Sequence, residues 1–169
     1  DEDVIETVLS LPSGKCHWRS VPHKLCVSER IQRLMGTACE TENDCERMFD
    51  SCRLLFSSKA FVLEAVKLVP LNVFAKLSTM ALQNNLEVIH VGFKKDPRII
   101  KYVDPQVVLN DSEIQEGLKY VVTKYPELLQ FACEETKCDR TLMLRLVKKN
   151  AKVMEYVSES LQSDEDFVY

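Results

Sequence analysis

Cysteine and histidine side chains in the N-terminal third offer the clearest potential for chemistry. Cys16, His17, His23 and Cys26 combine two thiols with two imidazoles, a ligand set that holds zinc in tetrahedral sites. Cys16 and His17 are adjacent, however, and neighbouring ligands rarely close such a site. We therefore favour packed or loop-exposed side chains over a zinc site, and the sequence predicts no cofactor.

The chain has seven cysteines, an odd number, so at least one thiol must be free or must pair between molecules. Cys133 and Cys138 flank a predicted loop, and a disulfide would join them if the turn folds back. In a reducing compartment both would remain thiols. Most of the cysteines are interpreted as small buried hydrophobes in a reducing compartment, which favours the cytoplasm or an organellar interior without identifying the location.

No arrangement of residues in the sequence points to catalysis. One of the three histidines, His90, lies beside Ile89 and Phe93 and is predicted to be packed or half-exposed, not catalytic. Glycine-rich phosphate-binding patterns are missing, and the pair Glu134 and Glu135 is typical of solvated charge. The sequence therefore predicts a protein that is not an enzyme.

Length and composition favour one soluble helical protein. The 169 residues are 46% hydrophobic and 28% charged, and only four are glycine, which disfavours a turn-rich β-sandwich. The formal net charge of −4 disfavours a nucleic-acid partner but is compatible with a protein partner. No apolar run reaches the roughly 18 residues of a transmembrane segment. Because the chain starts at Asp1, we expect an excised fragment or a processed mature chain.

An internal repeat organises the second half of the chain. Two segments match without gaps at an offset of 25 residues, in the order of their basic, apolar and aromatic positions: residues 124–132 with 149–157, and residues 138–143 with 163–168. The signature that begins at Pro126 recurs at Pro97 and, more weakly, at Pro70. Each unit predicts a longer helix, a short loop and a second short helix.

Helix signals recur in every unit. Polar residues suited to cap helix N-termini stand at Ser58, Asn85, Asn110 to Ser112, Asp139 and Asp164. Apolar pairs follow at helical spacing: Phe61/Val62 with Ala65/Val66, Val88/Ile89 with Gly92/Phe93, Leu118 with Val121/Val122, and Leu142/Met143 with Leu146/Val147. The prolines at 70, 97 and 126 are predicted to stop one helix and begin the next. Gly92 indicates that two helix backbones approach closely at its level.

Helical pairs of this kind cannot bury their own apolar faces, so neighbouring pairs must share a core. The sequence therefore predicts an all-α fold of helical-hairpin repeats, an α-solenoid-like array, with an irregular helical bundle as the alternative. Residues 1–57 are expected to form a divergent helical N-terminal segment. Residues 58–169 are expected to form tandem helical repeats packed as one continuous domain.

Residues 144–168, LRLVKKNAKVMEYVSESLQSDEDFV, carry a family resemblance. An aliphatic-Val-Lys-x-Asn helix end leads into a Tyr-aliphatic-Ser-Glu-x-Leu segment, and Ser-Asp with an aromatic-Val pair follows. This order is similar to the repeat of the family of domain of unknown function four-one-one-six (DUF4116). Residues 58–67 and, more loosely, residues 84–138 resemble it too, whereas residues 1–57 match poorly. The resemblance implies tandem helical repeats and supplies no catalytic residues.

Charge is spread unevenly along the chain. A basic cluster surrounds Asp96 and consists of Lys94, Lys95, Arg98 and Lys101. An acidic stretch near the end contains Glu155, Glu159, Asp164, Glu165 and Asp166. Solvated helix faces account for this pattern, and so does a surface that steers a protein partner, or another copy, into register. The basic cluster is the candidate partner-binding site.

We therefore expect a non-enzymatic helical-repeat module for protein–protein interaction, acting as a scaffold or as an accessory subunit of a larger assembly. The alternative is a thiol- or zinc-dependent function based in residues 1–57, where five of the seven cysteines lie.

Overall fold

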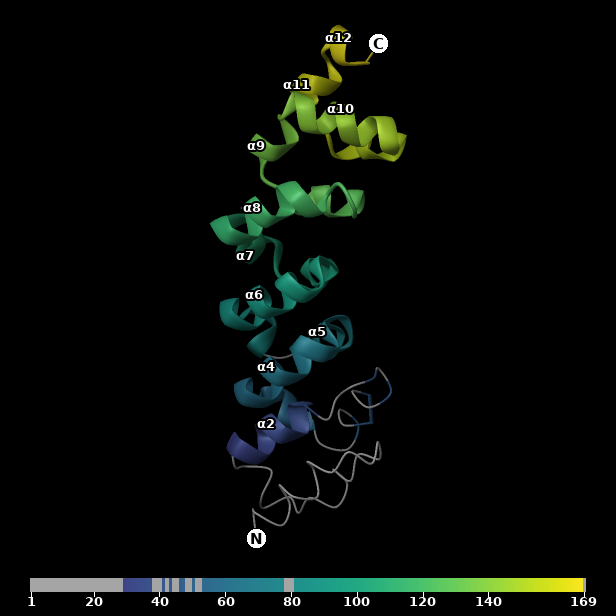
Figure 1. Ribbon diagram of the computed structural model, residues 1–169. Helices are drawn as coiled ribbons and strands as arrows, with labels where there is room; N and C mark the ends of the chain where they lie inside the picture. The colour runs from purple at the N-terminus through teal and green to yellow at the C-terminus, as the bar shows by residue number, and fades with distance from the viewer. Residues whose placement is uncertain are drawn as a thin grey trace. The chain divides into compact units, whose positions relative to one another are not determined.

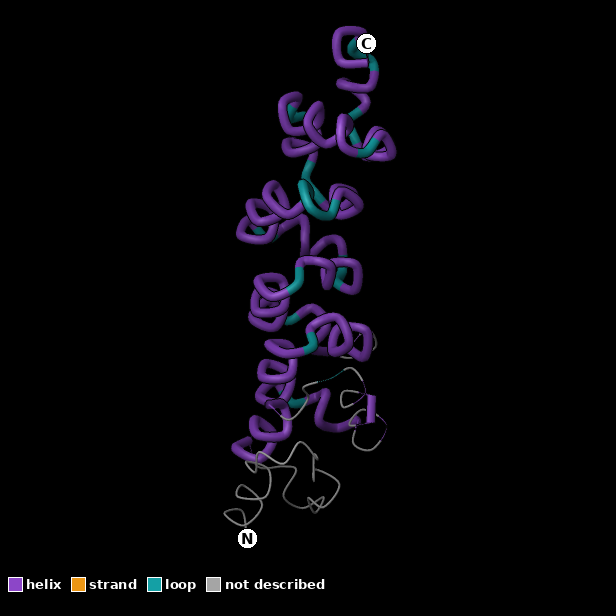
Figure 2. The backbone as a smooth tube through the Cα atoms, turned by 45° about the vertical axis from the view of Figure 1, so that its right-hand side comes forward, coloured by secondary structure: helices purple, strands orange, loops and turns teal. Residues whose placement is uncertain are grey.

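The computed structural model describes residues 29–37, 41, 43, 46, 47, 50, 53–77 and 81–168 of the chain. Regular structure in these residues is helical throughout, and they contain no strand (Figure 2). The predicted all-α fold class is therefore confirmed. None of the helices in these ranges is both long enough and apolar enough to cross a bilayer.

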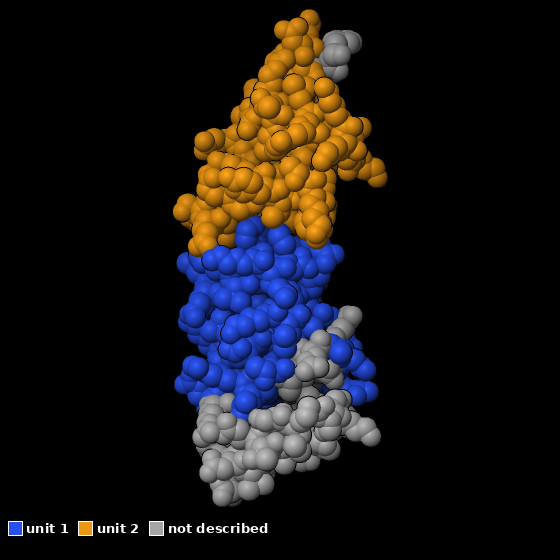
Figure 3. Space-filling model, in the orientation of Figure 1, with its two compact units in different colours: residues 1–102 blue, residues 103–169 orange. Residues whose placement is uncertain are grey.

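The chain divides into two compact units, residues 1–102 and residues 103–169 (Figure 3). This division lies between Tyr102 and Val103. The boundary predicted at residues 57 and 58 stays a prediction, because much of the segment before it lies outside the described residues.

The described residues of the first unit form short α-helices and 3-10 helices, the latter labelled η. They are α2 (Glu29–Thr37), η2 (Arg53–Ser57), α4 (Lys59–Leu68), α5 (Pro70–Leu77), η3 (Ala81–Asn84), α6 (Leu86–Lys95) and η4 (Pro97–Tyr102). α4 contacts both α2 and α6, and it lies between these two helices in Figure 1. η4 contacts α5 and α6. α4 therefore packs on helices that are not its immediate neighbours in sequence.

The second unit has the same kinds of element. They are α7 (Pro105–Asn110), α8 (Ser112–Val121), η5 (Pro126–Phe131), α9 (Glu134–Lys137), α10 (Arg140–Lys149), η6 (Ala151–Tyr156), α11 (Glu159–Gln162) and α12 (Glu165–Val168). η5 contacts α7, α8 and η6, and α10 contacts α9 and η6. η5 and η6, which are far apart in sequence, are thus direct neighbours.

The predicted caps and prolines set the helix boundaries. Ser58, Asn85, Asp111 and Asp139 each accept a hydrogen bond through the side-chain oxygen from the backbone N–H three residues on, at 2.9–3.4 Å. These bonds satisfy a backbone donor that the first helical turn leaves free. Proline, which needs no backbone donor at a helix start, is the first residue of α5, η4 and η5.

The predicted apolar pairs form the core. In α4 and α6 every member of the two double pairs is buried. In the second unit Leu118, Leu142, Met143 and Leu146 are buried. Val121 and Val147 are only half-buried, so the prediction was wrong for them. Val122 next to Val121 and Leu146 next to Val147 are fully buried, so each of the two valines lies at the edge of the buried face.

Two glycines lie where the packing is closest. A Cβ on Gly92 would lie 2.7 Å from Cε2 of Phe74 and 3.2 Å from Cγ1 of Val66. The close approach predicted at Gly92 is therefore present, but its partners are side chains and not a helix backbone. A backbone approach does occur at Gly36 of α2, where a Cβ would lie 2.5 Å from the carbonyl oxygen of Phe61 in α4.

Elements of the second unit recur at a fixed spacing. η6, α11 and α12 begin 25 residues after η5, α9 and α10, respectively. The backbone angles of the residues that end α9 and α11 also recur. Cys138 (φ −89°, ψ −7°) and Ser163 (φ −89°, ψ −4°) have the same conformation. Their N–H groups donate to the equivalent carbonyl oxygens of Glu134 and Glu159. This spacing equals the offset found in the sequence.

Candidate functional site

The second unit contains an open groove of about 760 Å³. α9, the end of η6 and α11 form its walls. Six of its lining residues bear the groups that could bind another molecule: Glu134, Lys137, Cys138, Glu155, Tyr156 and Glu159. We call this the α9–α11 groove.

Backbone and amide hydrogen bonds hold the walls together. The N–H of Ser158 donates to the carbonyl oxygen of Lys137 at 3.4 Å, which joins the start of α11 to the end of α9. Gln162 of α11 donates through Nε2 to the carbonyl oxygens of Met154 and Val157, both at 2.8 Å. α11 is thereby fixed to η6 and to the chain between them.

A buried glutamine positions the other wall. Gln115 of α8 is 7% exposed, and its Oε1 accepts from the N–H of Cys133 at 2.7 Å, just before α9 begins. Its Nε2 donates to the carbonyl oxygens of Val108 at 2.9 Å and Phe131 at 3.1 Å. The Gln115 amide therefore joins α7, η5 and the start of α9 to α8, and it pairs backbone groups that would otherwise be unsatisfied.

Negative charge dominates the α9–α11 groove. Glu134 pairs with Lys137 at 3.2 Å, so one of the three carboxylates has its own cation. Glu155 and Glu159 are exposed, and neither has an ion-pair partner among the described residues. The Tyr156 ring between these two carboxylates in sequence is half-buried. Such a surface can accept hydrogen bonds from cationic groups.

Cys133 and Cys138 are both free in this structure. They stand at the two ends of α9, and five residues of helical rise separate them by about 7.5 Å along the axis, which exceeds the separation that a disulfide spans. The Sγ atom of Cys133 lies 3.4 Å from Oγ1 of the buried Thr136. Cys138 is exposed and lines the groove. The disulfide that the sequence allows is therefore not formed, because the turn between them does not fold back.

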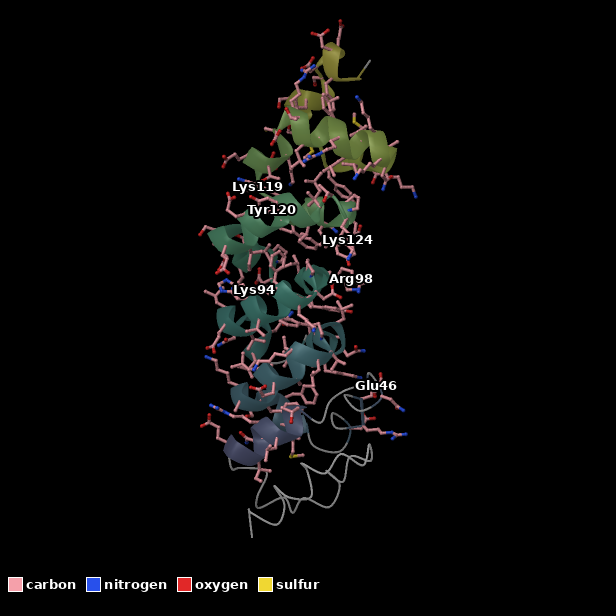
Figure 4. All side chains as sticks on the ribbon, viewed as in Figure 1. Glu46, Lys94, Arg98, Lys119, Tyr120 and Lys124 are labelled. Carbon is pink, nitrogen blue, oxygen red and sulfur yellow. The ribbon has the colours of Figure 1, made fainter. Side chains whose placement is uncertain are left out.

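The basic cluster is divided between two elements. Lys94 and Lys95 are in the last turn of α6, whereas Arg98 and Lys101 are in η4. Arg98 makes a bidentate pair with Asp96, with Nη2 to Oδ2 at 2.7 Å and Nε to Oδ1 at 3.0 Å, which offsets its charge. Lys101 places Nζ 4.9 Å from the centroid of the Tyr102 ring. Figure 4 shows Lys94 and Arg98 apart from each other.

Charged and polar side chains also lie on α8, at Glu116, Lys119 and Tyr120. The pKa of Lys119 is raised, first by the hydrogen bond from its Nζ to Oε1 of Glu116 (2.7 Å) and then by the negative charges of Glu116 and Glu135. Tyr120 beside it is 75% exposed and is labelled in Figure 4. Of the tyrosines at 102, 120, 125 and 156, Tyr120 is the exposed one.

The zinc candidates Cys16, His17, His23 and Cys26 lie outside the described residues. Within the part of the chain that the structure does describe, no three His, Cys, Asp or Glu side chains are grouped to hold a metal ion. His90 is half-buried on α6.

Sequence reasoning did not find the α9–α11 groove. The local pattern around Glu134 is typical of solvated charge, and Glu155 and Glu159 fall within an acidic stretch. A signal was present, because Glu134 and Glu159 differ by the 25-residue offset and each is the first residue of a short helix. The hydrogen bond from Ser158 to Lys137 joins the two short helices, and both carboxylates line one groove.

Comparison with protein families gives one match. Residues 118–162 and residues 139–169 both match the model of the family described as Domain of unknown function (DUF4116). The two matches together cover residues 118–169, and this part of the chain is similar to the DUF4116 family. The resemblance predicted from the sequence is thus confirmed for this part of the chain, and the whole α9–α11 groove lies within the DUF4116 segment. Neither the curated proteins nor the solved structures yield a match.

Proposed function

We propose that this protein is a non-enzymatic helical-repeat module that binds a partner protein, either as a scaffold or as an accessory subunit of a larger assembly. The observation that carries the proposal is the 25-residue recurrence of a 3-10 helix, a short α-helix and the start of a further α-helix within the residues that match DUF4116. Element bounds, terminal backbone angles and terminal hydrogen bonds recur together. This favours a repeat over an irregular bundle.

A repeat of this kind supports a binding role through its geometry. Each repeat is too small to bury its own apolar face, so neighbouring repeats share a core and leave an extended outer surface for partners. The contact of η5 with η6, and the packing of α4 between α2 and α6, are the neighbour contacts expected of an α-solenoid-like array. The charged groove between two successive short helices is a surface of the type that such arrays use.

The basic cluster is a second candidate surface in this proposal. Lys95 at the end of α6 and Lys101 in η4 are exposed cations that would steer an acidic partner surface. Arg98 contributes less, because Asp96 already pairs with its guanidinium. Removing Lys95 should therefore slow association more than removing Arg98.

Site-specific photo-crosslinking tests the interaction role. A benzophenone amino acid replaces Tyr156 in the α9–α11 groove, the exposed Tyr120 on α8, or Lys95 in the basic cluster, each in the full chain. Irradiation in an extract of the source cells should give a discrete protein adduct from at least one position, which mass spectrometry identifies. Circular dichroism shows that each variant is folded. Folded variants that give no protein adduct at any of the three positions would contradict the interaction role.

A further inference from the structure

We infer that the α9–α11 groove receives an extended basic segment of the partner, with Arg or Lys side chains placed between Glu155, Tyr156 and Glu159. This inference rests on the proposed interaction function and adds the chemistry of the segment that is recognised. Three properties of the groove support it: its uncompensated charge, its aromatic ring and its shape.

Charge complementarity identifies the occupant. The Glu134 carboxylate is offset by Lys137 at 3.2 Å, but Glu155 and Glu159 have no cation within the described part of the chain. An exposed carboxylate accepts hydrogen bonds from an ammonium or, in bidentate fashion, from a guanidinium. The groove therefore offers places for two cationic side chains, and an acidic segment would be repelled.

The aromatic ring and the apolar floor suit the same side chains. Tyr156 is half-buried, and a cation over its ring face would gain a cation–π contact. Val157 is 4% exposed and lines the groove beside Tyr156. Arg and Lys bury their aliphatic stems on such apolar surface while the charged end reaches polar groups. A small apolar ligand finds few partners here, because most of the lining side chains are polar.

The shape of the groove favours a peptide segment. Its volume of about 760 Å³ is in the range of sites that hold a whole small ligand, and it is open to solvent. The walls come from two equivalent short helices, α9 and α11, held together by the hydrogen bond from Ser158 to Lys137. A segment in extended conformation can lie between the two helices and direct alternate side chains toward the carboxylates.

Fluorescence anisotropy tests the charge requirement. The probe is a labelled octapeptide of alternating Arg and Ser, compared with octapeptides in which Gln or Glu replaces Arg. The full chain should bind the Arg peptide at low salt and not the Glu peptide, and binding should weaken as salt rises. The double variant Glu155→Gln/Glu159→Gln should lose roughly tenfold in affinity, the size expected for two exposed charge contacts. The control Glu165→Gln/Asp166→Asn removes two exposed carboxylates of α12 outside the groove and should bind like the unmodified chain.

Thiol protection locates the bound peptide. Cys138 lines the groove, whereas Cys133 at the other end of α9 does not. The Arg peptide should slow alkylation of Cys138 by N-ethylmaleimide several-fold and leave the rate at Cys133 unchanged, as measured by mass spectrometry of the digested protein. Equal protection of both thiols, or of neither, would place the peptide elsewhere and overturn the inference.

The outcomes separate this inference from the proposed function. If the Gln peptide binds as well as the Arg peptide, or if the double groove variant binds normally, basic recognition by the groove is wrong. Photo-adducts with a partner, combined with no binding of the Arg peptide, would overturn the basic occupant and leave the interaction function standing. Absence of photo-adducts at all positions would instead remove the function. Sedimentation velocity at low salt measures whether the chain forms dimers. If it does, and if both Lys95→Glu and the double groove variant abolish the dimers, the occupant is a second copy of the chain, which also overturns the inference.

Discussion

Adding one methyl group at Gly92 tests the packing of the first unit. Gly92 lies inside α6, and its Cβ would meet the ring of Phe74 at 2.7 Å and a methyl of Val66 at 3.2 Å. Alanine is favoured over glycine in a helix interior by about 1 kcal/mol. Overpacking a filled core costs about 1–3 kcal/mol. Phe74 and Val66 are fully buried and cannot turn away, so Gly92→Ala should destabilise the unit by about 1 kcal/mol.

A second substitution makes this expectation specific. Phe74→Leu removes the ring atoms that the new methyl would meet, at a cost of about 1–2 kcal/mol on its own. In that background Gly92→Ala should become neutral or stabilising, because the helix preference remains while the clash is relieved. The double-mutant cycle should therefore give a favourable coupling of about 1–2 kcal/mol between the two positions.

Hydrogen exchange followed by mass spectrometry measures the effect within the first unit, because amides of α6 report its local opening. A loss of about 1 kcal/mol speeds their exchange roughly fivefold where the amides exchange through opening of the unit. Gly117→Ala in α8 is the matched control, since Gly117 is a half-buried helix-interior glycine and should gain stability from helix preference. Slower exchange in Gly92→Ala, of the size seen in Gly117→Ala, would refute the close packing of α6 on α5.

Four further outcomes follow from single contacts. Asp139→Ala removes the cap of α10 and should lower the free energy of unfolding by about 1 kcal/mol in urea titration, whereas Asp139→Asn should retain it. Gln115→Leu leaves three backbone groups without their partner and should cost about 3 kcal/mol in the same titration. Cys138 should be alkylated faster than Cys133 in the unliganded chain, since only Cys138 is exposed. Glu116→Gln should lower stability near pH 7, because the raised pKa of Lys119 means that the folded chain holds this proton more tightly than the unfolded chain. The difference should begin to fall only above the ordinary lysine pKa of 10.5 and should vanish once the pH has passed the higher pKa of Lys119 in the folded chain.

Features set by neighbouring residues could be predicted from the sequence. The caps at Ser58, Asn85 and Asp139 and the helix starts at Pro70 and Pro97 depend on residues within one helical turn. Their physical causes are an unpaired backbone donor and a fixed proline φ angle. Both causes act independently of the rest of the chain, so the helix starts predicted at these residues are correct.

Features that depend on distant residues were predicted less well. Helical spacing placed Val147 in the core beside Leu146, but it is half-buried, whereas Val66 at the same position of α4 is fully buried. Gly92 was expected to allow a backbone contact, and the structure places side chains there. The backbone contact lies at Gly36, where nothing in the local sequence sets it apart. Spacing alone identifies the buried face of a helix but not what packs against it.

The α9–α11 groove illustrates how a repeat could extend such prediction to a site. Glu134 and Glu159 are too far apart in sequence to be joined by local rules, and each alone is an ordinary exposed carboxylate. Under a 25-residue repeat the two glutamates occupy equivalent positions, and stacked repeats bring equivalent positions to neighbouring elements. A charge that recurs at such a position therefore predicts a charged groove between adjacent repeats. By the same reasoning, Gln162 stands where Lys137 stands one unit earlier, so the cation that offsets Glu134 has no equivalent beside Glu159. That missing lysine is the reason why a partner would have to supply the positive charge.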